Sequence, residues 1–338
     1  MRGALSPIGG LYGLTMAARN AAYDRGRLRA HRLAVPVICV GNLSVGGTGK
    51  TPMVIWLCRY LERLGRRPGI LSRGYKAQGE DNDETRLLRE ALPETPVVVD
   101  ADRVRGGRRA MEKAGCDVLV LDDGFQHRRL ARDLDIVLVD ATRPFTMDVV
   151  LPAGRLRERP TGLRRAGAVV LTRTDLAGET ATTVLEAAVR NLTPRAVVAW
   201  SRHEPAALLG AYGEEYPLDW LKGRAVLAFC GLGNPQAFVG TLEGLGVQVV
   251  GRRDFPDHHH YSPGDLAALT EQASRQGAQG LVTTEKDWVK LRDLAGATEA
   301  APGQSAVARL AVVRLRIETA VTRGREELEA RIAAVVRS

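Results

Sequence analysis

Hydrophobic residues fall in short uninterrupted runs that are separated by longer amphipathic stretches. The run Val35–Val40 is apolar and rich in β-branched residues, and similar runs occur at about 68–72, 96–100, 117–122, 135–140 and 168–172. Such runs are typical of strands buried on both faces of a parallel sheet. Helical spacing over about 50–64, and in several other intervals, predicts β-α-β alternation with helices covering both faces.

A second α/β pattern begins near Ala225. Strand-like segments at 225–229, 247–250, 280–283 and 310–315 alternate with helical segments at 235–245, 263–276 and 325–336. The stretch 195–222 contains Pro and Gly and has little periodicity, so we place a domain boundary there. We therefore expect a parallel-sheet core domain over 35–200 and a smaller α/β domain over 201–338.

The N-terminal segment, residues 1–34, differs from both patterns. Ile8, Leu11, Tyr12 and Met16 fall at helical spacing, and a series of arginines follows at 19, 25, 27, 29 and 32. A basic amphipathic helix can lie in a membrane interface, or it can pack on the domain with a solvated basic face. The pattern alone favours neither. The sequence has no apolar run of the length that spans a bilayer, and no convincing signal peptide.

The charge of the chain narrows the class of partner. Lys and Arg total 48 against 39 Asp and Glu, which gives a formal net charge of +9 over 338 residues. Such a surplus attracts nucleic acid, anionic lipid headgroups or phosphorylated substrates. Aromatic residues make up only 5%, and no basic run is interleaved with them, which argues against base stacking on nucleic acid. The four cysteines lack metal-ligand spacing, which is consistent with a reducing compartment.

The segment after the first strand has the composition of a phosphate-binding loop. Glycine backbones can turn their N–H groups toward phosphate oxygens, and the following helix N-terminus adds a positive dipole. Lys50 would then reach the β- and γ-phosphates, and the Thr51 hydroxyl would bind Mg²⁺. One departure is that Ser occupies the place where the usual motif begins with Gly. The predicted nucleotide-binding residues are Ser44, Val45, Gly46, Gly47, Thr48, Gly49, Lys50 and Thr51.

Three further clusters hold candidate chemistry. Asp122 and Asp123 end a predicted strand downstream of the loop, where an acid commonly holds Mg²⁺ directly or through water. In the second domain, three histidines follow Asp254-Phe255-Pro256-Asp257. Adjacent side chains diverge, so a single histidine oriented by a carboxylate is a simpler interpretation than a metal site. A charged Thr284–Asp287 cluster ends another predicted strand, at the edge where α/β proteins bind ligands.

Together these stretches resemble the tetraacyldisaccharide 4′-kinase family of lipid A synthesis. The Ser at the head of the phosphate-binding loop is this family's own habit. The stretches that match are Val40–Thr51, Leu71–Tyr75, Asp122–His127, Leu151–Glu158, Phe255–His258 and Thr284–Asp287.

The resemblance implies ATP- and Mg²⁺-dependent phosphorylation of the 4′-hydroxyl of an acylated glucosamine disaccharide 1-phosphate, which gives a lipid IVA-type product. It implies a P-loop NTPase-like core, with the second domain closing over the active-site cleft. It also implies a peripheral enzyme on the cytoplasmic face of the bacterial inner membrane. This moves the interpretation of residues 1–34 toward membrane contact. Neither nucleic acid nor an obligate protein partner is expected.

Residue roles follow from the same resemblance. The catalytic role falls on Asp83, although Asn82-Asp83-Glu84-Thr85 replaces the family's Gly and Pro on either side of Asp-Glu. His258 would join Asp83 when the domains close, with Lys50 and Asp123 completing the catalytic set. The metal ligands would be Thr51, Asp122 and Asp123, and the substrate-binding residues Arg103, Arg157 and Gln126.

A P-loop switch protein that hydrolyses ATP or GTP to control a protein partner is the alternative from another class. Thr172-Arg173-Thr174-Asp175 only faintly echoes the guanine-binding Asn-Lys-x-Asp motif. A nucleic-acid-binding ATPase is a further alternative, suggested by the charge. A membrane-lipid kinase would require an amphiphilic acceptor, whereas a switch protein would require a protein partner.

Overall fold

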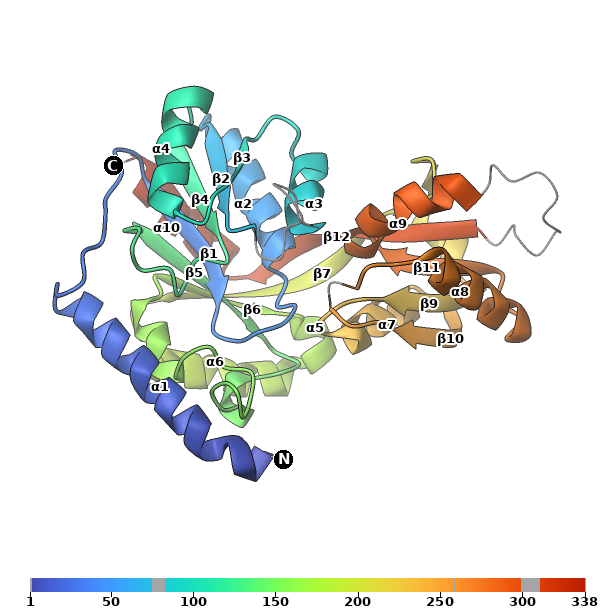
Figure 1. The fold of residues 1–338 in the computed structure, drawn as a ribbon, viewed down its shortest axis with the longest axis horizontal. Coiled ribbons are helices and arrows are strands. Elements are labelled where there is room, and N and C mark those ends of the chain that lie inside the picture. Colours follow the sequence, from blue (N-terminus) through green and yellow to red (C-terminus); the bar gives the residue numbers. More distant parts are fainter. Residues whose placement is uncertain (1, 75–82, 258, 299–310, 338) are drawn as a thin grey trace. The chain divides into compact units, whose positions relative to one another are not determined.

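The computed structural model describes residues 2–74, 83–257, 259–298 and 311–337, and it divides the chain into two compact units (Figure 1). The first unit contains Met1–Arg202 and Thr319–Ser338, and the second contains His203–Glu318. The chain passes between them twice, through strands β7 (Val197–Leu209) and β12 (Ala311–Arg323). No helix in the described part of the chain is long and apolar enough to cross a membrane.

The first unit is built on a parallel sheet in the order β7-β6-β5-β1-β4-β2-β3. Five of these strands are buried at every residue, namely β1, β2, β4, β5 and β6. Their burial on both faces explains why their sequences are continuously apolar. The strands are β1 (Val37–Asn42), β2 (Pro68–Ser72), β3 (Val97–Val99), β4 (Val118–Asp122), β5 (Leu134–Asp140) and β6 (Ala168–Thr172).

Helices cover both faces of this sheet. One face packs on α4 (Arg103–Ala114), α6 (Glu179–Leu192) and the 3-10 helix η2 (Pro160–Arg165). The other face packs on α2 (Lys50–Arg63), α3 (Asp83–Ala91) and α10 (Arg325–Arg337). The remaining helices of this unit are α1 (Arg2–Asp24), α5 (Thr174–Ala177) and η1 (Phe145–Met147).

Within the second unit the strands follow the order β10-β9-β11-β12-β7, with β8 (Glu215–Tyr216) antiparallel to β7. β9 (Ala225–Cys230), β10 (Gln248–Asp254) and β11 (Gly280–Thr284) are parallel to their neighbours. Alternate residues of β9 enter two separate cores, one with α7 (Pro235–Gly244) and one with α8 (Pro263–Arg275) and α9 (Glu285–Thr298). The short 3-10 helix η3 (Leu218–Leu221) precedes β9.

The expected α/β fold with a parallel core sheet is confirmed, and two details differ from the sequence analysis. The stretch 195–222, where we predict a boundary, contains the long strand β7. Residues after 318, assigned to the second domain, belong to the first unit. The physical reason is that Val321, Leu328 and Ile332 are buried in the same core as α2.

Candidate active site

The phosphate-binding loop connects β1, which ends at Asn42, to α2, which begins at Lys50. Gly46 and Gly49 have φ values of 110° and 86°, a region that side chains with a Cβ rarely adopt. Asn42 Nδ2 donates a hydrogen bond of 2.8 Å to Thr48 Oγ1, which fixes the loop from inside. The strand–loop–helix context required of an anion-binding loop is therefore present.

The end of β6 supports this loop through contacts that the sequence analysis missed. Thr172 Oγ1 donates to the Thr48 carbonyl at 3.1 Å, and the Arg173 guanidinium donates to the Gly47 carbonyl at 2.7 Å. The same guanidinium pairs with Asp140 at the end of β5. Arg173 is only 7% exposed. The feature of the sequence that could have indicated this role is that Arg173 directly follows a buried strand.

Asp123 lies between two cations. Its carboxylate is 3.6 Å from Lys50 Nζ, and each of its oxygens accepts a hydrogen bond of 2.9 Å from Arg157. Burial works to raise the pKa of Asp123, but Lys50 and Arg157 outweigh it and hold the pKa below its usual value. Asp123 is thus ionised, and the predicted acceptor arginine and the predicted nucleotide lysine contact the same carboxylate.

The pKa of Asp122, the neighbouring residue, is shifted in the opposite direction. Asp122 is 4% exposed, and its pKa is raised to about 7, first by burial and then by the negative charges of Glu84 and Asp123. A buried carboxylate that is half protonated near neutrality would become fully ionised beside a divalent cation. This donor chemistry, with Thr51 in the first turn of α2, fits the Mg²⁺ ion that the family implies.

Arg103 is the first residue of α4 and is 3% exposed. Burial and the nearby Arg73 lower its pKa, whereas Asp122 and Asp123 oppose that shift, so the guanidinium belongs to the same charged cluster. Its Nε atom has no hydrogen-bond partner among the described residues, and its Nη1 atom makes only contacts of 3.5 Å to two carbonyls. A buried guanidinium with spare donors is suited to binding an anion.

Gln126 lies shortly after the paired aspartates, and its side-chain amide donates hydrogen bonds to other parts of the protein. Its Nε2 atom donates to the Asn42 carbonyl at 2.9 Å and to Glu158 Oε1 at 3.0 Å. Its predicted contact with substrate stays a prediction. Glu158 ends the matching stretch Leu151–Glu158 but had no predicted role, and it is a buried centre of hydrogen bonds.

The proposed catalytic pair is only partly described. Asp83 is the first residue of α3, next to the Glu84 that raises the pKa of Asp122, so the N-terminus of α3 lies near the paired aspartates. His258 lies outside the described residues. Within the second unit, the neighbouring Asp257 pairs with Lys286 at 2.9 Å, and His259 Nε2 is 3.2 Å from an oxygen of Asp265.

The cluster 284–287 and the histidine loop meet within the second unit. Asp287 is fully buried and accepts hydrogen bonds from the Tyr261 hydroxyl, the Gly231 backbone N–H and the Thr284 hydroxyl. This carboxylate therefore fastens the end of the histidine loop to the end of β9. Among the residues that the structure describes, no group of three His, Cys, Asp or Glu side chains could hold a metal ion.

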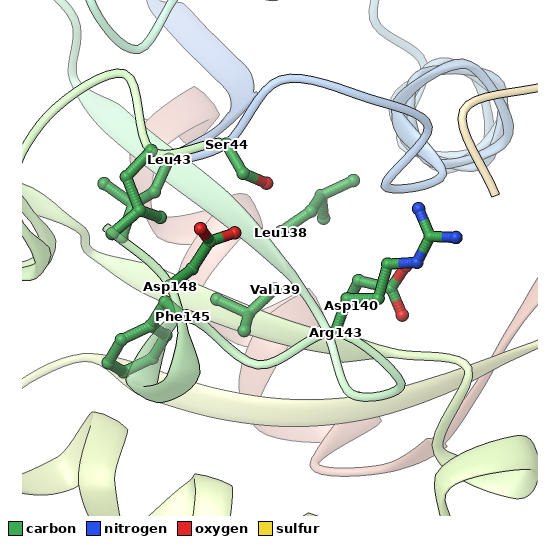
Figure 2. A pocket seen from close by; sticks show the side chains of 9 residues that line it. Leu43, Ser44, Leu138, Val139, Asp140, Arg143, Phe145 and Asp148 are labelled. Carbon is green, nitrogen blue, oxygen red and sulfur yellow. The ribbon is translucent and has the colours of Figure 1, made fainter. Parts of the chain in front are cut away.

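A small pocket lies beside the head of the phosphate-binding loop (Figure 2). Leu43 and Ser44 line it from the loop, and Asp140 lines it from the end of β5, with Arg143 close by in the same view. Asp148 closes another part of the wall, where hydrogen bonds with Arg155 hold its pKa below the usual value against the effect of burial. The nucleotide loop thus has beside it a small pocket whose wall combines apolar and charged side chains.

Known proteins that are similar to this chain share one name and align with most of its length. The chain is 45% identical over 335 residues to a tetraacyldisaccharide 4′-kinase of Anaeromyxobacter dehalogenans, which covers 94% of this chain and 86% of that protein. It is 43% identical over 305 residues to the protein of the same name from Syntrophus aciditrophicus, with 83% and 82% covered.

A solved structure agrees. The fold superposes on the crystal structure of LpxK from Aquifex aeolicus in complex with ATP with a TM-score of 0.75, at 34% identity and 99% coverage of both chains. The family model for tetraacyldisaccharide-1-P 4′-kinase matches residues 1–337. The chain therefore belongs to the tetraacyldisaccharide-1-P 4′-kinase family.

Proposed function

We propose that this protein transfers the γ-phosphoryl group of ATP to the 4′-hydroxyl of an acylated glucosamine disaccharide 1-phosphate. The observation that carries the proposal is the position of Asp123 between Lys50 of the nucleotide loop and Arg157. Arg157, a cation suited to a phosphate of the acceptor, thus shares one carboxylate with the lysine suited to the donor's phosphates.

In the proposed reaction, the acceptor 4′-oxygen forms a bond to the γ-phosphorus while the bond from that phosphorus to the ADP oxygen breaks. The hydroxyl proton passes to Asp83, the proposed base, and ADP leaves with the bridging oxygen. Lys50 and the N–H groups of the loop neutralise the phosphates. Arg103 and Arg157 bind the 1-phosphate of the acceptor, for which Arg157 exchanges its contact with Asp123.

Thr51 and the paired aspartates would hold Mg²⁺, which when bound neutralises charge on the β- and γ-phosphates. We assign Asp122 and Asp123 jointly to this role. His258, from the other unit, is proposed to pair with Asp83 and so strengthen the base.

The acceptor is lipid-linked, and α1 is suited to a membrane surface. Ile8, Leu11 and Leu14 on this helix are 56%, 67% and 57% exposed, an unusual cost for large apolar side chains in water. Exposed arginines at 25, 27 and 29 follow the helix and suit anionic headgroups. We propose peripheral attachment to the cytoplasmic face of the bacterial inner membrane through this helix.

The test is incubation with γ-labelled ATP and an acylated disaccharide 1-phosphate in detergent, followed by mass analysis of the lipid product. We expect the label on the lipid, a product heavier by one phosphate, and ADP formation that depends on the acceptor. Acceptor-independent release of inorganic phosphate, with an unmodified lipid, would instead support a P-loop switch.

A further inference from the structure

Three side chains of α1 bind the two loops that border the site. The Tyr12 hydroxyl donates a hydrogen bond of 3.0 Å to the Arg157 carbonyl, and Asn20 Nδ2 donates one of 2.8 Å to Glu158 Oε2. Arg19 donates to the Gln126 carbonyl at 3.0 Å. Tyr12, Arg19 and Asn20 are half-buried against the first unit, whereas Leu11 and Leu14 are exposed.

The Glu158 carboxylate is the point where these contacts converge. It is 2% exposed and accepts hydrogen bonds from Asn20, from Gln126 and, through both of its oxygens at 2.9 Å, from Arg165. A buried carboxylate depends on such partners because it has lost its hydration. Arg165 is itself held over the ring of Phe125, 4.3 Å from the ring centroid.

From this centre the contacts lead directly into the site. Gln126 donates to the Asn42 carbonyl at the end of β1, and the Arg157 backbone N–H donates to the Leu43 carbonyl at 2.7 Å. The backbone of Arg157 is therefore fixed on one side by the nucleotide loop and on the other by Tyr12 of α1. Its guanidinium then meets Asp123.

Close packing along α1 keeps the helix in this position. A Cβ atom at Gly13 would lie 3.3 Å from a side-chain carbon of Val150, so the glycine lets the helix approach the segment that leads to Arg157. Arg128 adds a bond of 2.8 Å to the Asn20 carbonyl and pairs with Asp24 at 2.7 Å. The inward face is thus fastened along most of its length.

We propose that the inward face of α1 forms part of the active-site scaffold, and that Tyr12, Asn20 and Glu158 are positioning residues for Arg157. The proposal rests on the assignment of Arg157 to the acceptor's phosphate. One helix then has two separable roles, since its outward side chains face the lipid surface and its inward side chains set where the anionic end of the acceptor binds.

The experiment compares Tyr12→Phe and Asn20→Ala with wild type in detergent micelles, where vesicle binding plays no part. Two acceptors are used, one with and one without the 1-phosphate, and the readout is the ratio of their kcat/KM values. We expect each substitution to reduce this ratio by about three- to tenfold, as for one lost hydrogen bond, with the KM for ATP unchanged. Glu158→Gln replaces an accepting oxygen by an N–H donor that faces other donors. This substitution should reduce the ratio by about tenfold or more.

Tyr23→Phe is the matched control, because it removes the same group from the same helix while the ring of Tyr23 makes the contacts with Arg19 and Arg128. It should preserve the ratio. Melting temperatures confirm that each variant is folded.

If Tyr12→Phe and Asn20→Ala keep full discrimination while Arg157→Ala loses it, the scaffold proposal is overturned and the proposed function stands. Equal losses on both acceptors would mean a merely structural role and would also overturn it. If Arg157→Ala itself keeps full discrimination, the assignment of Arg157 fails, and the scaffold proposal fails with it.

Discussion

At the scale of single residues, neighbouring groups in this site differ because their surroundings differ. Asp122 and Asp123 are adjacent in the chain, yet the pKa of the first is raised by burial and nearby negative charge, while Lys50 and Arg157 hold the second low. The surroundings thus favour the charged form of Asp123, whereas Asp122 would ionise fully when a cation binds. This division suits a site that must assemble a metal and a nucleotide together.

His127 provides a pH test at the same scale. Its pKa is lowered to about 4, first by burial and then by Arg103, Arg132 and Arg19, with Asp102 opposing them. The unfolded chain therefore binds this proton more readily than the folded chain, so stability is present above the usual histidine pKa and is lost as the pH falls toward 4. We expect the free energy of unfolding to decline between about pH 6.5 and pH 4, and His127→Gln to flatten this decline.

The measurement is chemical denaturation of both proteins at several pH values. Because other groups titrate in the same range, the difference between the two curves is the relevant quantity. Parallel curves would show that His127 titrates normally in the folded protein.

The sequence was sufficient for residues whose role follows from local order, and insufficient for those whose role depends on the fold. Lys50, Thr51 and Asp122 occupy their expected places because a strand, a loop and a helix position them. Arg173 and Glu158 were not predicted. Their partners, the Gly47 carbonyl and Asn20, lie far away in the sequence and come near only when the sheet and α1 have formed.

At the scale of elements, burial explains which segments could be predicted. The wholly buried strands are continuous apolar runs, whereas β7 contains Arg202, His203, Glu204 and Pro205 in its middle and so resembled a linker. The helix α10 was expected, but its place in the first unit was not, because an amphipathic pattern does not identify the surface against which a helix packs.

The placement of α10 can be tested by two buried substitutions. Ile332 in α10 is fully buried in the first unit, and Leu269 in α8 is 1% exposed in the second. Each replacement by Ala should cost about 2–5 kcal/mol in its own unit, through lost burial and a residual cavity. Hydrogen exchange should show increased opening of β1 and β4 in Ile332→Ala, and of β9 and β11 in Leu269→Ala. If Ile332→Ala loosened only β9 and β11, the assignment of α10 to the first unit would be wrong.

The outward face of α1 gives a second prediction at this scale. Replacing Leu11 and Leu14 together by Ser should weaken binding to vesicles that contain anionic lipid by roughly tenfold or more, since each leucine contributes on the order of 1 kcal/mol. Val184→Ser is the control, because this residue is 68% exposed on α6, outside the proposed membrane face. Sedimentation with vesicles measures the effect, and unchanged binding of the double variant would rule out an interfacial α1.

At the scale of the whole molecule, the two units are joined by two strands and contribute different parts of the proposed chemistry. The first holds the nucleotide loop, the paired aspartates and Asp83, and the second holds the loop of His258. The proposed pairing of His258 with Asp83 would therefore need a residue from each unit at the reacting hydroxyl. Such an enzyme loses turnover, rather than ATP affinity, when the residue supplied by the second unit is removed.

Single and double substitutions test this cooperation. His258→Ala should lower kcat by on the order of 10²–10⁴-fold with ATP affinity nearly unchanged, as for a lost acid–base partner. His259→Ala and His260→Ala should cost far less. The combination with Asp83→Ala should lose less than the product of the single losses, because the two residues act as a unit. Equal losses at all three histidines would instead indicate a metal-binding tract.

The central claim is phosphate transfer to one particular hydroxyl, and a matched pair of acceptors tests it most directly. The measurement is the amount of γ-label transferred to an acylated disaccharide 1-phosphate and to its 4′-deoxy analogue, with Lys50→Ala as the inactive control. We predict transfer to the first acceptor, none to the second, and a loss of at least about 10²-fold in Lys50→Ala, because Lys50 neutralises the transferred phosphoryl group. Equal labelling of both acceptors, or undiminished transfer by Lys50→Ala, would contradict the account.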